Sequence, residues 1–451
     1  MADGEHIQAA WRDLGRRLAE LRQARSLTQH ELARLLFVSR STIANVETGH
    51  QKVPREFWEN CDTVLGADQT FAGRYTEIQE AASRDREPVA RRRRRAVVSK
   101  AGLAAPRLAT GEDPDQEPIV VTLAAEALDL ATWAEQTNVG DMTIDALADG
   151  ASRLARDYLK KPPLPVLREA AAAYRRVSGL LRGGHQSLRQ TRDLYVIGGR
   201  LLAFLSWVSS DIGQSAAAEA HARAAWIMAE QADHDSLRAI VLIAQGKNAY
   251  WEGRFQEAAG LARRGLECAP PNTARVLLAS QLGDARQADG DITGALEAQT
   301  AAKRARDQVL IDDAPGGIWA CGRARQANYA MSVHLRTGNP AGALAEAETA
   351  RQAYEAGEDW AYGTWAQIRI ASGIAHLIAG RVDGAASELA PILTMPPERR
   401  LATLTTRLGE VGMRLSDRRY QGSTEATELR QQIADYRAHA VTARALPPGQ
   451  S

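Results

Sequence analysis

The sequence has few of the residues that would place it in several common classes of protein. Only three cysteines occur in 451 residues, at positions 61, 268 and 321. Their wide separation excludes a disulfide framework and a closely spaced thiol metal site, and it fits a reduced compartment. No apolar run approaches the roughly 20 residues that a membrane-spanning helix needs, and the N-terminus has no apolar signal core. We therefore expect a cytoplasmic protein with no membrane segment.

Aromatic residues, strand-like patterns and net charge are scarce as well. Aromatic residues make up 5% of the chain, and the formal net charge is +1, which by itself does not indicate a nucleic-acid-binding protein. No stretch alternates Val, Ile, Thr and aromatic residues with period two, whereas the helix formers Ala, Leu, Arg and Glu are abundant. Because cores stop growing at roughly 250 to 300 residues, we expect an all-α protein of at least two units.

Motifs that carry enzymatic chemistry are missing too. The chain has no Gly-x-Ser-x-Gly elbow, Walker A loop or zincin helix. His221 and His234 are 13 residues apart, and His334 and His376 occupy equivalent positions of a repeat, which favours structural histidines over a metal site. We therefore expect no enzymatic activity, no cofactor and no metal site.

What the sequence does contain, between residues 27 and 49, is the pattern of two short helices joined by a tight turn. Thr28 and Glu31 have the spacing of a capping box at the start of the first helix, and Ser39 begins the second. Apolar residues fall where two crossing helices would bury them together, at Leu32, Leu35, Leu36, Val38, Ile43 and Val46. The outer face of the second helix keeps side chains suited to a groove edge: Arg40, Ser41, Thr42, Ala44, Asn45 and Thr48.

By spacing and residue type, this segment resembles the helix-turn-helix of the phage-repressor and Cro family, also called the XRE family, over about residues 11 to 80. The resemblance implies a DNA-binding domain of the five-helix type in which Arg22 pairs with Glu47. The residues that we expect at the DNA, with Gln29 on a phosphate, are Gln29, Ser39, Arg40, Ser41, Thr42, Asn45 and Lys52. The family usually has glycine in the turn where this chain has Phe37, so either the turn is reshaped or Phe37 is anchored by packing.

Charge placement after this segment leaves two interpretations open. Residues 1 to 80 carry ten Lys or Arg against twelve Asp or Glu, but the stretch 84 to 100 is strongly basic and includes five consecutive arginines, 91 to 95. Such a block either adds phosphate affinity beside the DNA-binding module or is a solvated linker. The division that we expect is a DNA-binding domain at 1–80, a basic flexible linker at 81–118, a helical-repeat domain at 119–440 and a disordered tail at 441–451.

A repeat runs through the second half of the chain. Its centres combine a turn glycine with a small residue five positions later, as in Gly253 to Ala258, and we place a degenerate sixth centre at Arg418 to Ser423. The small residues are Ala218, Ala258, Ala295, Ala343, Ala385 and Ser423, separated by 40, 37, 48, 42 and 38 positions. Periods of this size predict stacked helical hairpins, that is, an α-solenoid. The unit with Gly246, Ala258, Leu266 and Pro270 resembles the tetratricopeptide repeat.

If the tetratricopeptide register holds, the first helix of each hairpin lines a concave inner wall. Polar residues on that wall could grip a peptide backbone, and aromatic residues could form apolar pockets, although each aromatic is also explained by ordinary helix packing. The inner-wall residues are Arg200, Trp207, Lys247, Tyr250, Trp251, Asp284, Gln287, Arg325, Asn328, Ser332 and Arg336, of which the first nine are the candidate ligand-binding set. The longest inter-repeat insertion, around Asp312 to Trp319, is a loop of the kind that often lines a site.

The two halves together predict a sequence-specific transcription regulator. Its helical-repeat domain would sense a peptide or small-molecule effector and mediate oligomerisation, and a homodimer would bind a palindromic operator in double-stranded DNA. The architecture is similar to that of the peptide-receptor regulators of Gram-positive bacteria and to actinobacterial XRE regulators. One alternative is an interaction scaffold whose solenoid binds a protein while the N-terminal module only localises it to DNA. Another is an N-terminal module that has lost DNA binding.

Overall fold

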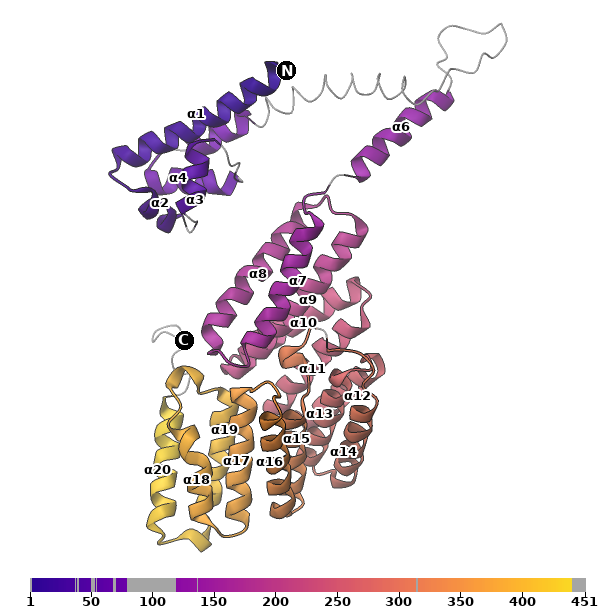
Figure 1. Cartoon of the computed structure of the whole chain (residues 1–451), viewed down its shortest axis with the longest axis vertical. Coiled ribbons are helices and arrows are strands. Elements are labelled where there is room, and N and C mark those ends of the chain that lie inside the picture. The colour runs from indigo at the N-terminus through magenta and orange to yellow at the C-terminus, as the bar shows by residue number, and fades with distance from the viewer. Residues whose placement is uncertain are drawn as a thin grey trace. The chain divides into compact units, whose positions relative to one another are not determined.

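The chain is helical throughout the residues that its structure, a computed structural model, describes (Figure 1). These residues are 2–36, 38, 40–49, 53, 55–67, 70–78, 119–135, 137–313 and 315–439, and no strand occurs in these ranges. The linker at 81–118, the tail at 441–451 and Phe37 lie outside them. The fold divides into two compact units, Met1–Trp133 and Ala134–Ser451, which are described separately below.

The described part of the first unit contains five helices with the bounds below and a further helical stretch at residues 70–78. Its helices are α1 (Ala2–Ala24), α2 (Gln29–Leu35), α3 (Arg40–Glu47), α4 (Arg55–Leu65) and α6 (Ile119–Ala134). Trp58 lies at the centre of the core, with Phe57 against its ring edge and Phe71 stacked on it. The carboxylate of Asp62 accepts the backbone N–H groups of Phe71 and Ala72, so α4 fixes the start of the 70–78 helix.

A close helix crossing holds α1 against the end of α3. A Cβ atom at Gly15 would lie 2.1 Å from the carbonyl oxygen of Val46, so only glycine fits there. Leu14 and Leu18 of α1 are buried on the same side as Ile43 and Val46 of α3. By contrast, α6 keeps large apolar side chains exposed, among them Leu130 and Trp133.

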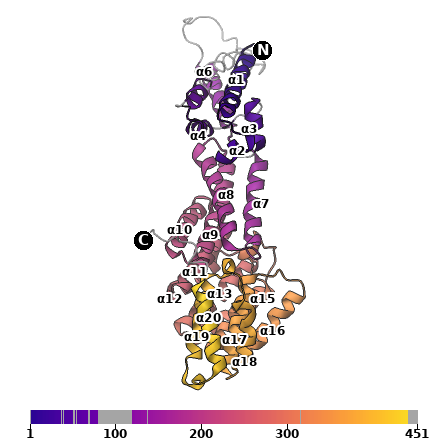
Figure 2. The ribbon, with the colours of Figure 1, turned by 90° about the vertical axis from the view of Figure 1, so that its left-hand side faces the viewer.

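The second unit is a series of antiparallel helix pairs, which Figure 2 shows from the side. Its first two helices are α7 (Asp141–Asp157) and α8 (Pro163–Gly183). Six pairs follow: α9 (Leu188–Asp211) with α10 (Ser215–Gln231), α11 (Asp235–Trp251) with α12 (Phe255–Cys268), α13 (Thr273–Asp289) with α14 (Ile292–Asp307), α15 (Arg323–Arg336) with α16 (Pro340–Glu355), α17 (Tyr362–Ile378) with α18 (Val382–Leu393), and α19 (Ala402–Leu415) with α20 (Thr424–Ala438). Three 3₁₀ turns lie in the loops: η1 (Gly317–Trp319), η2 (Pro397–Arg399) and η3 (Arg418–Tyr420).

A left-handed glycine makes the turn inside each of these six pairs. The turn glycines are Gly213, Gly253, Gly290, Gly338, Gly380 and Gly422, with φ between 67° and 92°, and the second helix begins two residues after each of them. The sixth centre is therefore not the expected Arg418 to Ser423, because Arg418–Tyr420 form η3 and the turn glycine is Gly422. The helix pairs and the solenoid class are confirmed.

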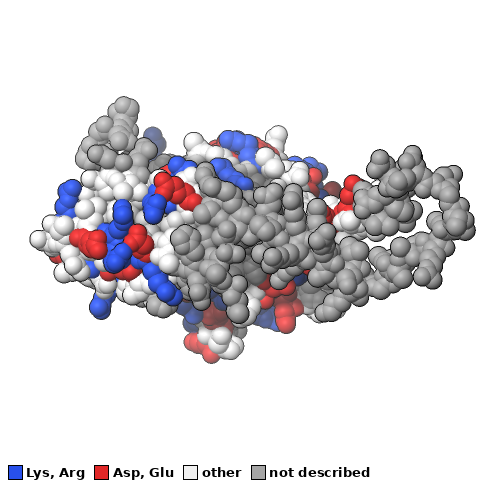
Figure 3. Space-filling view, turned by 90° about the horizontal axis from the view of Figure 1, so that it is seen from above, with Lys and Arg blue, Asp and Glu red and all other residues white. Residues whose placement is uncertain are grey.

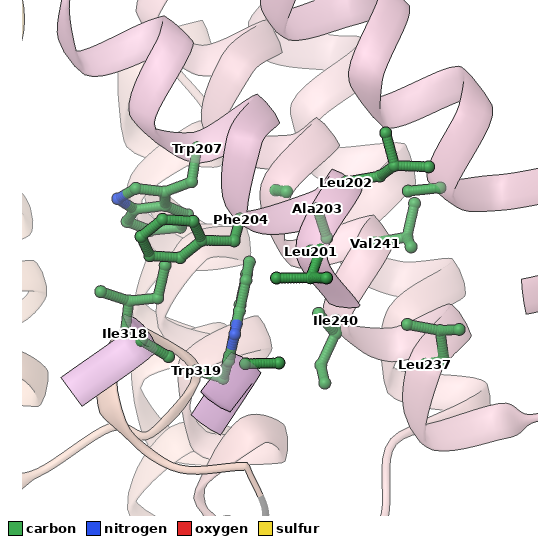
Figure 4. Close-up of a cluster of buried hydrophobic side chains, with 14 of the residues drawn as sticks. Leu201, Leu202, Ala203, Phe204, Trp207, Leu237, Ile240, Val241, Ile318 and Trp319 are labelled. Carbon is green, nitrogen blue, oxygen red and sulfur yellow. The ribbon is translucent and has the colours of Figure 1, made fainter. Parts of the chain in front are cut away.

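The first helices of successive pairs pack side by side. Contacts run from α9 to α11 and on through α13, α15 and α17 to α19, while the second helix of each pair covers the outside. The alanines predicted at the turn centres are where the two helices of a pair meet, and Ala218, Ala295 and Ala385 are completely buried there. In Figure 4, Phe204 and Trp207 of α9 face Ile318 and Trp319 of the loop around η1. No described helix has both the length and the apolar character that crossing a bilayer requires.

Candidate functional sites

The helix α3 has one buried face and one exposed face. Ile43 and Val46 are buried, whereas Arg40 and Asn45 are exposed and Thr42 is half-buried. The capping box predicted for the preceding helix is present: Thr28 Oγ1 accepts the backbone N–H of Glu31, and the Glu31 carboxylate accepts the backbone N–H of Thr28. Ser39, Lys52 and the side chain of Ser41 lie outside the described residues.

A buried ion pair fixes the end of α3 to α1. Arg22 donates from Nε and Nη2 to the two oxygens of Glu47, at 2.6 and 3.1 Å, and from Nη1 to the carbonyl of Leu27 at 2.7 Å. Gln29 Nε2 donates to the same carboxylate at 2.8 Å. An amide nitrogen has two protons, so one proton of Gln29 is left for the phosphate contact that the family resemblance implies. The pair connects α1, α2 and α3 and so determines the position of α3 relative to the other two helices.

Charge on the surface seen in Figure 3 is mixed, with blue and red side chains interspersed over the described part. On α1, Arg16 and Arg17 both lie beside Asp13. A surface of this kind gives little long-range attraction to a polyanion, so any selective contact has to come from individual side chains.

The second unit encloses a cavity of about 450 Å³ against its inner helices. Seven of the nine candidate ligand-binding residues line it: Trp207, Lys247, Tyr250, Trp251, Asp284, Arg325 and Asn328. Arg200 and Gln287 are not among the lining residues. Gln287 lies behind the wall and donates from Nε2 to Asp284 at 3.1 Å. The Nε of Arg200 is buried with no hydrogen-bond partner, and burial lowers the pKa of this guanidinium.

One side of the cavity contains a buried ion pair to which a tyrosine is hydrogen-bonded. Lys247 Nζ lies 2.9 Å from Asp211 Oδ1 and donates to the carbonyl of Trp207 at 3.0 Å. The other carboxylate oxygen accepts the hydroxyl of Tyr158 at 2.7 Å. Burial lowers the pKa of Lys247, an effect that the negative charge of Asp211 opposes, and burial together with that charge raises the pKa of Tyr158 well above its usual range. Each of these buried polar groups therefore has a partner within the protein.

The opposite side presents an acid without a cation in contact. Asp284 is 8% exposed, and among the described residues no Lys or Arg nitrogen lies within 4.0 Å of its carboxylate. Burial raises the pKa of Asp284 to about 6, while Arg407 and the polar groups of Gln287, Ser332 and Tyr250 lower it. Arg407 itself pairs with Glu410 at 3.3 Å.

Arg325, from the first turn of α15, lies over the ring of Trp207. Its Nη1 donates to the carbonyls of Ile318 at 2.6 Å and Ala320 at 2.9 Å, which fixes the plane of the guanidinium. The distance from the guanidinium carbon to the Trp207 ring centre is 5.1 Å. No carboxylate in the described part of the chain forms an ion pair with Arg325, in contrast to Lys247 and Arg407.

The segment after α7 meets the later part of the helical series beside the cavity. The backbone N–H of Tyr362, at the start of α17, donates to the carbonyl of Leu159 at 3.0 Å, and Lys160 pairs with Asp359 at 3.0 Å. Arg399 Nη2 donates to the carbonyl of Lys160 at 3.2 Å. The short segment after α7 thus closes the curve of helices and forms one wall of the cavity.

Sequence reasoning missed several lining residues because they meet only through this closure. Tyr158, Tyr362 and Arg407 line the cavity but come from helices far apart in the chain, and no local pattern marks them. The loop singled out by its length does line the cavity, through Asp313, Gly317 and Ile318.

Metal-binding groups are not assembled in the described part of the chain. No three His, Cys, Asp or Glu side chains there could hold an ion together. Cys61 and Cys321 are buried and Cys268 is partly exposed, and all three are free thiols. Burial raises the pKa of the Cys321 thiol to about 11, which makes it a poor nucleophile.

Comparison with known protein families identifies part of the N-terminal unit. A family described as a helix-turn-helix domain matches residues 13–71, which contain the end of α1, all of α2 to α4 and the capping and ion-pair residues described above. No significant match to a curated protein or to a solved structure was found. A helix-turn-helix domain indicates a DNA-binding regulator rather than an enzyme. The N-terminal part of this chain is thus a helix-turn-helix domain, followed by an all-helical region of paired helices.

Proposed function

We propose that this protein is a sequence-specific transcription regulator of the XRE type, in which α3 reads bases in the major groove. The observation that carries the proposal is the division of α3: its buried face is fixed to α1 through Arg22 and Glu47, while Arg40 and Asn45 remain exposed. Arginine bonds guanine and asparagine bonds adenine at the groove edge, so these two side chains have the chemistry for base recognition. Ser39, Ser41, Thr42, Gln29 and Lys52 complete the proposed DNA-binding set.

The proposed regulator acts as a cytoplasmic homodimer on a palindromic operator. One α3 helix reads a half-site of a few base pairs, and two of them must lie about one DNA turn, roughly 34 Å, apart to read a palindrome. Whether residues 91 to 95 add phosphate contacts is a separate question, which the salt dependence of binding would answer.

The proposed effector site is the cavity of the helical region, which resembles a tetratricopeptide solenoid. Its volume lies in the range of ligand pockets, and its lining combines Trp207, Tyr250 and Trp251 with a few polar groups. Asn328 makes no hydrogen bond with another described residue, so its amide could pair with a peptide group of a ligand. A ligand that binds one curvature of the helical series better than another would shift the population toward it, and the closure contacts around Leu159 and Tyr362 would respond to that shift.

The DNA-binding part is tested by replacing Arg40 and Asn45, singly, with alanine in the full chain. Bound genomic fragments are first selected in vitro, and affinity is then measured by fluorescence anisotropy at fixed salt. Because each base contact contributes about 1 to 3 kcal/mol, we expect a loss of roughly 10- to 100-fold for the selected site and a smaller loss for unrelated DNA.

The control for this test is Arg16→Ala, which removes an exposed arginine of α1 that is not on α3. Arg40 and Asn45 are exposed, so thermal stability should hardly change in either variant. Unchanged operator affinity in Arg40→Ala and in Asn45→Ala would show that α3 does not read bases.

A second candidate function is an interaction scaffold whose helical region binds a protein partner. The observation that favours it is the exposed apolar side chains of α6, such as Leu130 and Trp133, just before this region in the chain, which could extend the surface for a partner. Under this alternative, the full chain would bind DNA in the same way with and without small ligands, and a stable complex with another protein would form in gel filtration.

A further inference from the structure

The charges that line the cavity fall into a paired group and an unpaired group. Lys247 pairs with Asp211, and Arg407 pairs with Glu410. Five other lining charges form no ion pair among the described residues: Arg306, Arg325, Asp284, Asp313 and Glu358.

Three of these five use their bonding groups inside the protein. Thr273 bonds both oxygens of Asp313, and the backbone N–H groups of Arg323 and Ala324 bond both oxygens of Glu358. Arg306 donates from Nε and Nη2 to Gln326 and Cys321. Arg325 and Asp284 remain as candidates for a ligand. Burying a charge without an ionic partner is costly, so this pair of opposite sign is suited to a ligand that supplies both partners.

The unpaired cation is already oriented for a carboxylate. Both protons of Arg325 Nη1 are directed to the carbonyls of Ile318 and Ala320, and the guanidinium lies over Trp207. The edge formed by Nε and Nη2 keeps its protons, and this edge matches the two oxygens of a carboxylate. The segment around η1 therefore positions Arg325 without neutralising it.

The acid, Asp284, lies on α13, which packs beside α15. Ser332 of α15 lines the cavity and is one of the polar groups acting on the Asp284 carboxylate. Arg325 and Ser332 are seven residues apart on α15, which at 1.5 Å per residue is about 10 Å. The two positions on α15 are thus much farther apart than the amine and carboxylate of a free amino acid, which share one carbon.

We propose that the cavity binds a zwitterion with the length of a tripeptide, its carboxylate on the Nε/Nη2 edge of Arg325 and its protonated amine at Asp284. An extended residue spans roughly 3.3 to 3.6 Å, so three residues cover about 10 Å. The inference rests on the proposed function, since it names the chemistry of the effector that the cavity takes.

The test compares chemical forms of one ligand on the full-length protein. A library of unmodified tripeptides is screened by thermal shift, and the tripeptide that binds best is titrated by calorimetry as the free, N-acetylated, C-amidated and doubly blocked form. Each blocked end removes a charge-assisted contact, so we expect each to weaken binding by about 10- to 100-fold. Free amino acids and hexapeptides should bind more weakly than the free tripeptide.

Two variants test which residue binds which end of the tripeptide. Arg325→Gln should weaken the free and N-acetylated forms but leave the affinity for the amide unchanged, and Asp284→Asn should weaken the free form and the amide but not the N-acetylated form. The matched control is Arg264→Gln, which removes an arginine placed over Trp226 of an outer helix, at 5.2 Å, and should change none of these affinities. Circular dichroism of each variant checks folding, and the blocked peptides test the idea on the unaltered protein even where a variant misfolds.

The results separate this inference from the proposed function. Equal binding of free and doubly blocked tripeptides, the absence of any tripeptide binding at millimolar concentration, or tighter binding of free amino acids would overturn the inference while leaving DNA recognition untouched. The expected pattern of tripeptide binding in a protein that binds no DNA would support the inference and refute the proposed regulator.

Discussion

Each unit of this protein contains a buried ion pair, but the surroundings of the two pairs differ. In the helix-turn-helix unit, Arg22 and Glu47 bond each other, a carbonyl and an amide inside a close-packed core. In the helical-repeat unit, Lys247 and Asp211 lie on the wall of a cavity that Arg325 and Asp284 also line, each without an ion-pair partner among the described residues. The first arrangement holds a surface helix in position, and the second leaves charge on the wall of a cavity.

This difference fits the two kinds of ligand in the proposed function. The exposed polar side chains of the first unit, Arg40 and Asn45, lie outside its core, where the proposed ligand, DNA, is too large to be enclosed. The polar groups of the second unit line a cavity of about 450 Å³, which has room for the proposed small effector. Under this proposal, buried charge is structural in one unit and available for binding in the other.

The largest effect that we expect comes from breaking the Arg22–Glu47 pair. In Arg22→Met the Glu47 carboxylate stays buried without its cation, which should cost about 3 to 5 kcal/mol of the stability of the first unit. Amide hydrogen exchange followed by mass spectrometry measures the change separately in peptides from residues 11–78 and 137–439. Protection should fall in the first set and stay constant in the second.

The double variant Arg22→Met with Glu47→Leu is the control for this prediction. Replacing a buried ion pair by apolar residues of similar size is often neutral, so much of the lost protection should return. If the single variant is as stable as the unaltered protein, the pair does not hold α3 in place, and the buried charge of the first unit is not structural.

The next effect in size is a gain of stability in Asp284→Asn that depends on pH. Burial raises the pKa of Asp284 from its usual value of 3.8 to about 6, so between these values the carboxyl holds its proton more tightly in the folded than in the unfolded chain. Stability from this group is present below about pH 4 and is lost as the pH rises through 6. At pH 7.5 asparagine should raise the free energy of unfolding by up to about 3 kcal/mol, as two pKa units imply.

Urea denaturation at pH 4 and at pH 7.5 measures this gain, which should be near zero at the lower pH. Asp145→Asn, at an exposed position of α7, serves as the control and should show no comparable difference. A gain of equal size at both pH values would mean that the benefit comes from packing rather than from charge, and that Asp284 is not a strained acid facing the cavity.

Local patterns were sufficient to predict most of the first unit, although Leu35, which was expected in the buried stripe, is 48% exposed. A capping box, a buried apolar stripe and exposed short polar residues all occur within 23 consecutive positions, and the family match covers them. The repeat of turn glycine and small residue likewise predicted the helical hairpins, because a left-handed turn and a close helix contact each need a particular residue type. Only the sixth centre was misplaced, since η3 adds a turn that no residue pattern marks.

The cavity could be predicted only in part, for a physical reason. Inner-wall positions follow from the repeat register, which is why Trp207, Lys247 and Arg325 were expected there. The pairing of Lys247 with Asp211 and the closure between Leu159 and Tyr362 depend on how the whole series of helices curves. That curvature is a sum of small rotations at each repeat, and no single segment of sequence encodes it.

The smallest effects should come from the two capping boxes, one in each unit. Thr28 caps α2, a helix of seven residues, and Ser187 caps α9, a helix of 24 residues, each with its third residue bonding back. Thr28→Ala and Ser187→Ala should each cost about 1 kcal/mol, because both leave backbone N–H groups of a first turn without an acceptor. The consequences should nevertheless differ between the units.

In the first unit, a short helix has few other hydrogen bonds to hold its start, so Thr28→Ala should also increase amide exchange across α2 and lower operator affinity through the position of Gln29. In the second unit, α9 is packed along most of its length against α10 and α11, so exchange should increase only in its first turn. Hydrogen exchange resolved to single helices measures both. If the effect of Thr28→Ala stays within the first turn of α2, as expected for α9, tertiary packing rather than local capping holds the start of the helix-turn-helix motif.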